Sequence, residues 1–148
     1  MKILIATDGS DFSRTAIERC CRMLKLSEHP QIKIISVYEP LAPMATEPFA
    51  ISAQYYQEMM DLARKQCETF AADSVEQIKK MIPGANSNVQ TEVRLGAPAR
   101  VIVEEAKDWN ADLIVVGSHG RSFWGRLTLG SVSDAIVHHA PCSVLVAR

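Results

Sequence analysis

The chain has few cysteines, and their spacing excludes the usual metal and disulfide scaffolds. There are 4 in 148 residues. Cys20 and Cys21 are adjacent, while Cys67 and Cys142 stand alone, which fits neither a metal-ligand spacing nor a disulfide framework. We expect reduced and mostly buried thiols, with a redox role for the Cys20 and Cys21 pair as the alternative.

Long apolar runs and an excess of charge of one sign are also missing. The first apolar run, at 3–6, is much shorter than a signal-peptide core or a membrane span. Sixteen basic residues against 17 acidic ones give a formal net charge of -1, so the chain lacks the excess of positive charge that binding to nucleic acid or anionic membranes favours. We therefore expect a cytoplasmic protein without nucleic-acid or membrane partners, in which any anion site is local.

Two common phosphate-binding motifs are absent as well. The sequence contains no Gly-x-x-x-x-Gly-Lys-Ser/Thr, so the lysine that reads phosphates in P-loop enzymes is missing. The dinucleotide motif Gly-x-Gly-x-x-Gly does not follow the first expected strand, which disfavours NAD and FAD as cofactors.

Five strand-like segments alternate with four helical ones, which indicates a single domain over 1–148. Strands are expected at 2–6, 32–37, 89–94, 113–116 and 143–147, and helices at about 12–24, 54–81, 98–109 and 132–139. Such alternation implies right-handed βαβ crossovers. The predicted fold is therefore an α/β, mostly parallel, doubly wound five-stranded sheet of order 3-2-1-4-5 with helices on both faces.

Apolar patterning predicts what the longest helix and two of the strands face. Large apolar side chains recur at helical spacing over 54–81, and we expect them to face the core: they are Tyr55, Met59, Leu62, Phe70 and Ile78. Residues 89–94 alternate between apolar and polar, as an edge strand does, whereas 113–116 is uniformly apolar and is expected to be central and covered on both faces.

The last strand is apolar on both faces although the predicted order puts it at a sheet edge. Val144, Leu145 and Val146 form this run. An open apolar edge invites association, so we predict a homodimer in which this strand pairs antiparallel with a second copy. The alternative is that a helix of the same chain covers the edge.

Two loops follow the carboxyl ends of neighbouring strands, where ligands bind in doubly wound sheets. Residues 6–10 form one loop, and the other contains Gly117-x-x-Gly120 followed nine residues later by Gly130-Ser131 at a helix start. Glycines permit close backbone approach and positive φ, and a helix N-terminus offers unpaired N–H groups. The layout favours a polyphosphate, with further donors expected at Arg121, Arg126, Ser131 and Ser133.

Three segments, 1–10, 117–131 and 139–146, resemble the universal stress protein family in its nucleotide-binding branch, and the resemblance covers the whole chain. It implies ATP or another adenine nucleotide as ligand, with Mg²⁺ as a candidate cofactor. Around the phosphates it implies Gly117, Ser118, His119, Gly120, Arg121, Gly130, Ser131, Val132 and Ser133. It also implies that adenine lies at the backbone of Val37 near Ala6 and Thr7, and that Asp8 lies near the ribose or the metal.

Several of these residues have a simpler interpretation. Asp8 suits a helix cap, His119 suits a polar loop position better than a catalytic base, and Phe123 with Trp124 forms either a lid or a partner surface. The leading hypothesis is an ATP-occupied homodimer that reports nucleotide state or stress to an unidentified protein partner. Its rival is a slow Mg²⁺-dependent ATPase or phosphotransferase that uses Asp8, and an empty dimerisation domain is disfavoured by the intact glycine motif.

Overall fold

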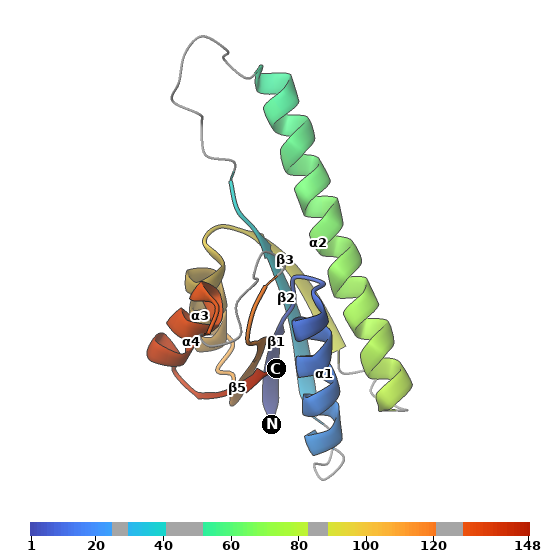
Figure 1. The fold of residues 1–148 in the computed structure, drawn as a ribbon, viewed down its shortest axis with the longest axis vertical. Coiled ribbons are helices and arrows are strands. Elements are labelled where there is room, and N and C mark those ends of the chain that lie inside the picture. The colour runs from blue at the N-terminus through green and yellow to red at the C-terminus, as the bar shows by residue number, and fades with distance from the viewer. Residues whose placement is uncertain (25–29, 41–51, 83–88, 121–128) are drawn as a thin grey trace.

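The fold is a single parallel sheet between two layers of helices (Figure 1). The structure is a computed structural model and describes residues 1–24, 30–40, 52–82, 89–120 and 129–148. The strands are β1 (Lys2–Ala6), β2 (Gln31–Tyr38), β3 (Val89–Leu95), β4 (Leu113–Gly117) and β5 (Ser143–Ala147). The helices are α1 (Asp11–Leu24), α2 (Ala53–Met81), α3 (Pro98–Asp108) and α4 (Ser131–His139).

The strand order is β3-β2-β1-β4-β5, and every neighbouring pair is parallel. The predicted order and fold class are therefore confirmed. β1 is the middle strand and pairs with β4 through Ile3 opposite Leu113 and Ile5 opposite Val115. Because these two strands are neighbours, the loops that follow them lie at the same edge of the sheet, as predicted.

The two faces of the sheet carry separate apolar cores. Ile3 and Ile5 of β1 pack with the α1 and α2 residues, whereas Leu4 and Ala6 pack with the α3 and α4 residues. Successive side chains of a strand point to opposite faces, so an uninterrupted apolar strand is buried on both sides. β4 shows the same division, which confirms the prediction that it is covered on both faces, although it lies beside the central strand.

The two edge strands differ in their patterning. β3 carries exposed side chains along most of its length, as the alternation predicts for an edge. On β5, Val144 and Val146 are half-buried against the α3 and α4 core, and Leu145 is half-buried against the α1 and α2 core. Helices of the same chain thus cover part of both faces of β5, while β4 is the one strand that pairs with it among the described residues.

The face of α2 was predicted wrongly in its first half. Tyr55 and Leu62 are 52% and 61% exposed. The buried residues of the helix are Met60, Cys67, Ala71, Ser74 and Ile78. Small and polar side chains form much of the face that packs on the sheet, so a prediction based on large apolar residues alone selected the wrong face of the helix. Figure 1 also shows that the N-terminal part of α2 projects beyond the sheet. A 29-residue helix is roughly 44 Å long, well beyond the span of these strands.

The cysteines behave as the sequence indicated. Cys20, Cys21 and Cys67 are buried, and no disulfide joins any of the four cysteines. Desolvation raises the pKa of the Cys20 thiol to about 12, with the neighbouring Cys21 contributing, and desolvation raises the pKa of Cys21 to about 11. The reactive thiolate form is therefore disfavoured at both positions. Among the described residues, no helix has the length and apolar character that a membrane crossing requires.

Candidate functional site

A pocket of about 420 Å³ opens beyond the carboxyl ends of β1, β2 and β4. Predicted site residues that line it are Ala6, Thr7, Asp8, Val37, Gly117, His119, Gly120, Gly130, Ser131, Val132 and Ser133. Ser118 is fully buried behind this lining. Arg121, Arg126, Phe123 and Trp124 lie outside the described residues. The structure thus brings together almost all of the predicted residues that it describes.

Six further lining residues were not predicted: Ser13, Ile35, Glu39, Pro98, Ile102 and Val116. Ile35 lies two residues before Val37 on β2 and so points to the same face of the sheet, which means that the strand period alone could have predicted it as a lining residue. Pro98 and Ile102 belong to α3, whose apolar stripe reads as ordinary core. Only the packing of α3 across β2 turns its first turns toward the pocket.

The N-terminus of α4 forms one wall of the pocket. No helical turn precedes the N–H groups at 131–133, so they have no intrahelical acceptor. Gly130, the N-cap, has no side chain that could accept from them. The helix dipole adds partial positive charge at this point. An anion placed in this part of the pocket would meet several backbone donors at once.

Hydrogen bonds tie this helix end to the loop after β4. The Gly130 N–H donates to the Ser118 carbonyl at 2.8 Å, and the Ser133 hydroxyl donates to the same carbonyl at 2.8 Å. The Ser133 hydroxyl also lies 2.9 Å from the Gly130 carbonyl. We expected Ser133 to donate to a ligand. In this structure its hydroxyl donates within the loop, so Ser133 holds the first turn of α4 to the loop at this wall of the pocket.

The three motif glycines are needed for space and not for an unusual backbone. Positive φ occurs at Gly9 and Gly96 among the described glycines, so Gly117, Gly120 and Gly130 do not use the positive φ that glycine also permits. A Cβ on Gly117 would lie 2.7 Å from the backbone carbon of Phe12. On Gly120 it would lie 3.1 Å from Asp8 Oδ2, and on Gly130 it would lie 3.2 Å from the Ser118 carbonyl.

The loop after β1 is held by side-chain hydrogen bonds. Asp8 Oδ1 accepts from the Ser10 N–H at 3.1 Å and from the Ser10 hydroxyl at 2.6 Å. Ser10 in turn accepts from the Ser13 N–H at 3.2 Å and caps α1. Asp8 therefore orients the capping residue and does not cap the helix itself. Its Oδ2 lies beside Gly120, 3.1 Å from the position that a Cβ on this glycine would take.

Thr7 contributes to the pocket from a buried position. Its hydroxyl lies 3.3 Å from the Ser13 hydroxyl and 3.3 Å from the Ser74 hydroxyl of α2, and it accepts from the Gly9 N–H at 3.3 Å. These contacts point the Thr7 side chain toward α1 and α2. The backbone at the end of β1 is consequently rigid where it meets the pocket.

His119 is buried, with 6% of its surface exposed. Its Nδ1 lies 3.0 Å from the Ser118 hydroxyl, and its ring centroid lies 5.1 Å from that of Phe12 at an interplanar angle of 53°. The ring contact holds the loop against α1, and the Ser118 contact lies within the loop itself. They favour the polar loop interpretation of His119 over that of a catalytic base.

The family model for the universal stress protein family matches residues 1–148. The chain belongs to the universal stress protein family. It is 30% identical over 148 residues to a universal stress protein of Methanocaldococcus jannaschii, with 99% of this chain and 81% of that protein covered.

Solved structures of other universal stress proteins share the fold. One from Lactobacillus plantarum is 26% identical, has a TM-score of 0.78, and is covered over 97% of its length by 100% of this chain. Another, determined in complex with cAMP, is 25% identical with a TM-score of 0.70, and 100% of this chain covers 97% of it. The fold class and the family resemblance are thus both confirmed.

The charge of the pocket in this universal stress protein is unusual for an anion site. Its described lining contains the carboxylates of Asp8 and Glu39 and neither lysine nor arginine. Backbone N–H groups are therefore the main donors that the described lining offers. No cluster of three or more metal-ligating side chains occurs in the described part of the chain.

Proposed function

We propose that the pocket binds an adenine nucleotide, with its phosphates at Gly120 and the first turn of α4 and its base between α3 and β2. The observation that carries the proposal is the division of the pocket into two ends. One end has the backbone donors of a helix N-terminus, and the other is an apolar slot. The complex of a related universal stress protein with cAMP supports this choice of ligand class.

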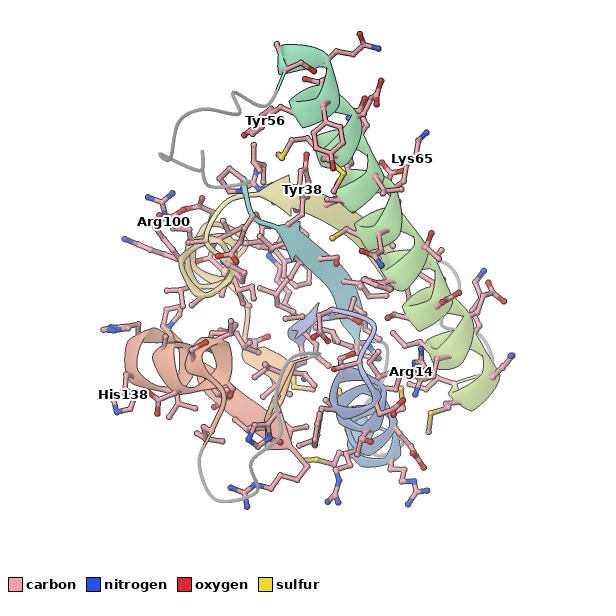
Figure 2. The ribbon with its side chains drawn as sticks, turned by 45° about the horizontal axis from the view of Figure 1, so that its top comes forward. Arg14, Tyr38, Tyr56, Lys65, Arg100 and His138 are labelled. Carbon is pink, nitrogen blue, oxygen red and sulfur yellow. The ribbon has the colours of Figure 1, made fainter. Side chains whose placement is uncertain are left out.

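The slot at the α3 end suits a flat apolar ring. Ile35 and Val37 of β2 face Pro98 and Ile102 of α3 across it. Aliphatic side chains on two sides accommodate a planar base, while backbone groups at the end of β2 can select its polar edge. Tyr38 marks this end of β2 in Figure 2. Asp8 lines the pocket beside Gly120, and the ribose of a bound nucleotide would lie near it.

Magnesium fits the donor set if the phosphates share in holding it. Mg²⁺ is commonly bound by one or two carboxylates together with phosphate oxygens, and Asp8 supplies a carboxylate beside Gly120. Bound Mg²⁺ would offset the negative charge of the phosphates next to Asp8 and Glu39. We place it at Asp8 for the di- and triphosphates.

We further propose that the protein acts as a homodimer that reports nucleotide occupancy to a protein partner, with ATP as the principal ligand. β5 supplies the dimer contact because its outer edge offers backbone groups for antiparallel pairing. Val144, Leu145 and Val146 would then complete their burial in the second copy.

Calorimetric titration with ATP, ADP, AMP and cAMP tests the binding site. Gly120→Val places a branched side chain against Asp8 at the mouth of the phosphate end, and we expect its ATP affinity to fall about tenfold or more. Circular dichroism verifies that the variant is folded. Unchanged ATP affinity in a folded Gly120→Val protein would reject this placement of the phosphates.

The rival function is slow Mg²⁺-dependent ATP hydrolysis or phosphoryl transfer, which Asp8 beside the glycine loop would support. The contacts of His119 disfavour it as a base for water, so the carboxylates of Asp8 and Glu39 are the remaining candidates in the described lining. We expect phosphate release well below about 1 per second, the low end of ordinary enzymes. Turnover near that rate, lost in Asp8→Asn, would favour the enzyme instead.

A further inference from the structure

A cluster of charged side chains lies between α3 and the sheet, outside the pocket. Glu105 of α3 contacts Lys33 of β2, with Oε1 2.6 Å from Nζ, and Arg94 of β3, with Oε2 3.4 Å from Nη2. Lys33 Nζ is also 3.7 Å from Glu92 Oε2. The Glu105 side chain is 8% exposed and that of Lys33 14%. Charges this deeply buried are uncommon and depend on their partners.

Trp109, which ends α3, extends the same attachment. Lys33 Nζ lies 4.9 Å from the centroid of its ring, and Lys2 Nζ lies 5.7 Å from it. Lys2 Nζ also donates to the Trp109 carbonyl at 3.1 Å. Polar contacts thus hold the C-terminal half of α3 to β1, β2 and β3, and Glu105 is at the centre of them.

The charged cluster and the apolar slot both lie between α3 and β2, next to each other. Lys33, Ile35 and Val37 lie on one face of β2 because they are two residues apart. Ile102 and Glu105 lie one turn apart on the same side of α3. Ile35, Val37 and Ile102 line the pocket, whereas Lys33 and Glu105 meet directly below it.

We propose that Glu105 is a positioning residue that sets the separation of α3 and β2 and so preorganises the slot for the base of the nucleotide. The inference rests on the proposed function. Glu105 does not line the pocket, so it acts through Ile102 and Ile35 and not by contact with the ligand. A slot already at the spacing of a planar ring spends little binding free energy on ordering.

Loss of the Glu105 charge would loosen this layer. Glu105→Gln keeps the shape of the side chain but leaves Lys33 and Arg94, two cations, against a neutral amide. Glu92 then remains as the carboxylate near both cations, 3.7 Å from Lys33 Nζ and 3.3 Å from Arg94 Nε. Lys33 loses its close partner and gains by turning toward Glu92 or water, Arg94 stays paired with Glu92 on β3, and α3 loses its ionic attachment to β2 and β3.

The test compares adenosine with ATP, because adenosine has the base and ribose but no phosphate. Calorimetry is performed on the full chain well below its unfolding midpoint. We expect Glu105→Gln to weaken adenosine and ATP by the same factor, about tenfold. Gly130→Val, which fills the phosphate end, should weaken ATP and leave adenosine nearly unchanged.

Glu104→Gln is the matched control. Glu104 is the adjacent residue of α3, and its partner is Arg100, 3.8 Å away and largely exposed. Figure 2 shows Arg100 on the outer side of α3, away from the sheet. Glu104→Gln removes the same charge from the same helix without touching the cluster, so we expect both affinities to match those of the wild type.

A double-mutant cycle tests the central pair directly, and a milder variant keeps the test decisive if a member of the cycle is poorly folded. Lys33→Met removes the other half of the central pair, and the effects of Glu105→Gln and Lys33→Met on adenosine affinity should be strongly non-additive. Arg94→Gln, at the more exposed side of the cluster, should shift adenosine affinity in the same direction by a smaller factor.

The outcomes separate this inference from the function it rests on. Wild-type protein that binds neither adenosine nor ATP defeats the proposed function, and this inference with it. Wild-type binding with unchanged adenosine affinity in Glu105→Gln defeats the positioning role alone. A loss of affinity confined to ATP also overturns it, because the effect would then lie at the phosphates. An equal loss in Glu104→Gln overturns it as well, because the effect would then belong to any charge on α3.

Discussion

At the scale of single residues, the glycines of the loop motif serve different purposes. Gly117 allows the N-terminal turn of α1 to pack directly on β4, because any Cβ there would meet backbone atoms of Phe12 and Ser13. Gly120 and Gly130 instead line the pocket, and a Cβ there would lie 3.1 Å from Asp8 Oδ2 or 3.2 Å from the Ser118 carbonyl oxygen. One motif thus combines a packing requirement with a binding requirement.

Gly117→Ala should therefore destabilise the fold more than Gly130→Ala does. We expect a loss of about 1 to 3 kcal/mol in the free energy of unfolding for Gly117→Ala, since backbone atoms 2.7 to 2.9 Å away must move. Gly130→Ala, with its nearest neighbour at 3.2 Å, should lose less stability and more ATP affinity. Urea unfolding and calorimetry measure the two effects, and equal stabilities would contradict the assignment of Gly117 to packing.

The buried cysteines predict a stability change at alkaline pH. Below the ordinary thiol pKa of 9.0, Cys20 and Cys21 are protonated in both the folded and unfolded states. Above it the unfolded state ionises first, because burial holds the folded pKa values at about 12 and about 11. Their stabilising contribution therefore falls as pH rises from 9.0 toward those values.

Urea unfolding at about pH 8 and about pH 10.5 measures this effect. Wild type should lose more stability between the two pH values than Cys20→Ala, which removes one buried thiol but leaves the other alkaline titrations in place. The same loss in both proteins would show that Cys20 does not contribute. Native Cys20 and Cys21 should also resist thiol reagents until the protein unfolds.

At the scale of elements, the first turn of α4 and the loop after β4 form one hydrogen-bonded unit. The Ser118 carbonyl accepts from both Gly130 and Ser133, while the Ser118 N–H donates to the Ala147 carbonyl at 2.7 Å. The helix N-terminus is thereby fixed to both the loop and β5. Donors held in place before binding lose little entropy when an anion arrives.

Ser133→Ala should weaken that unit without unfolding the protein. Removal of the buried hydroxyl takes away its bonds to Ser118 and Gly130, at a cost of about 1 kcal/mol in unfolding free energy. We expect ATP affinity to fall severalfold and adenosine affinity to stay unchanged, because the loosened wall faces the phosphates. Ser143→Ala, at the exposed start of β5, is the control. Equal losses for adenosine and ATP would contradict the local role.

At the scale of the whole molecule, the open edge of β5 tests the proposed homodimer. The Ala147 carbonyl accepts from Ser118, so the backbone of Ala147 faces β4, and the N–H of the preceding Val146 faces the open edge. Leu145 is a poor site for a charge because it packs against the chain's own core. A proline at Val146 removes an edge donor, which a monomer tolerates.

Val146→Pro is thus expected to convert a dimer into a folded monomer. Light scattering at micromolar concentration gives the mass, and circular dichroism verifies the fold. Val137→Ala, which changes an exposed apolar residue of α4, is the control and should stay dimeric. A monomeric wild type, or a Val146→Pro protein that stays dimeric, contradicts pairing through β5.

The sequence by itself determined the order of elements, the parallel sheet and the two loops at one crevice. These follow from local patterns, since each strand and helix has its own periodicity and parallel strands require crossovers of one hand. Asp8, Gly120 and Gly130 could be placed in one site from this argument, although 110 residues or more separate the first from the other two.

Only the tertiary structure decided which side chains face the pocket and which hold it in place. The inward stripe of α2, the engaged hydroxyl of Ser133 and the slot at Ile102 depend on how helices cross the sheet. The contact of Glu105 with Lys33 joins residues 72 positions apart and produces no periodic pattern in the sequence. Periodicity records the environment of a residue along its own element, whereas a contact between elements depends on their separation and rotation, which packing alone fixes.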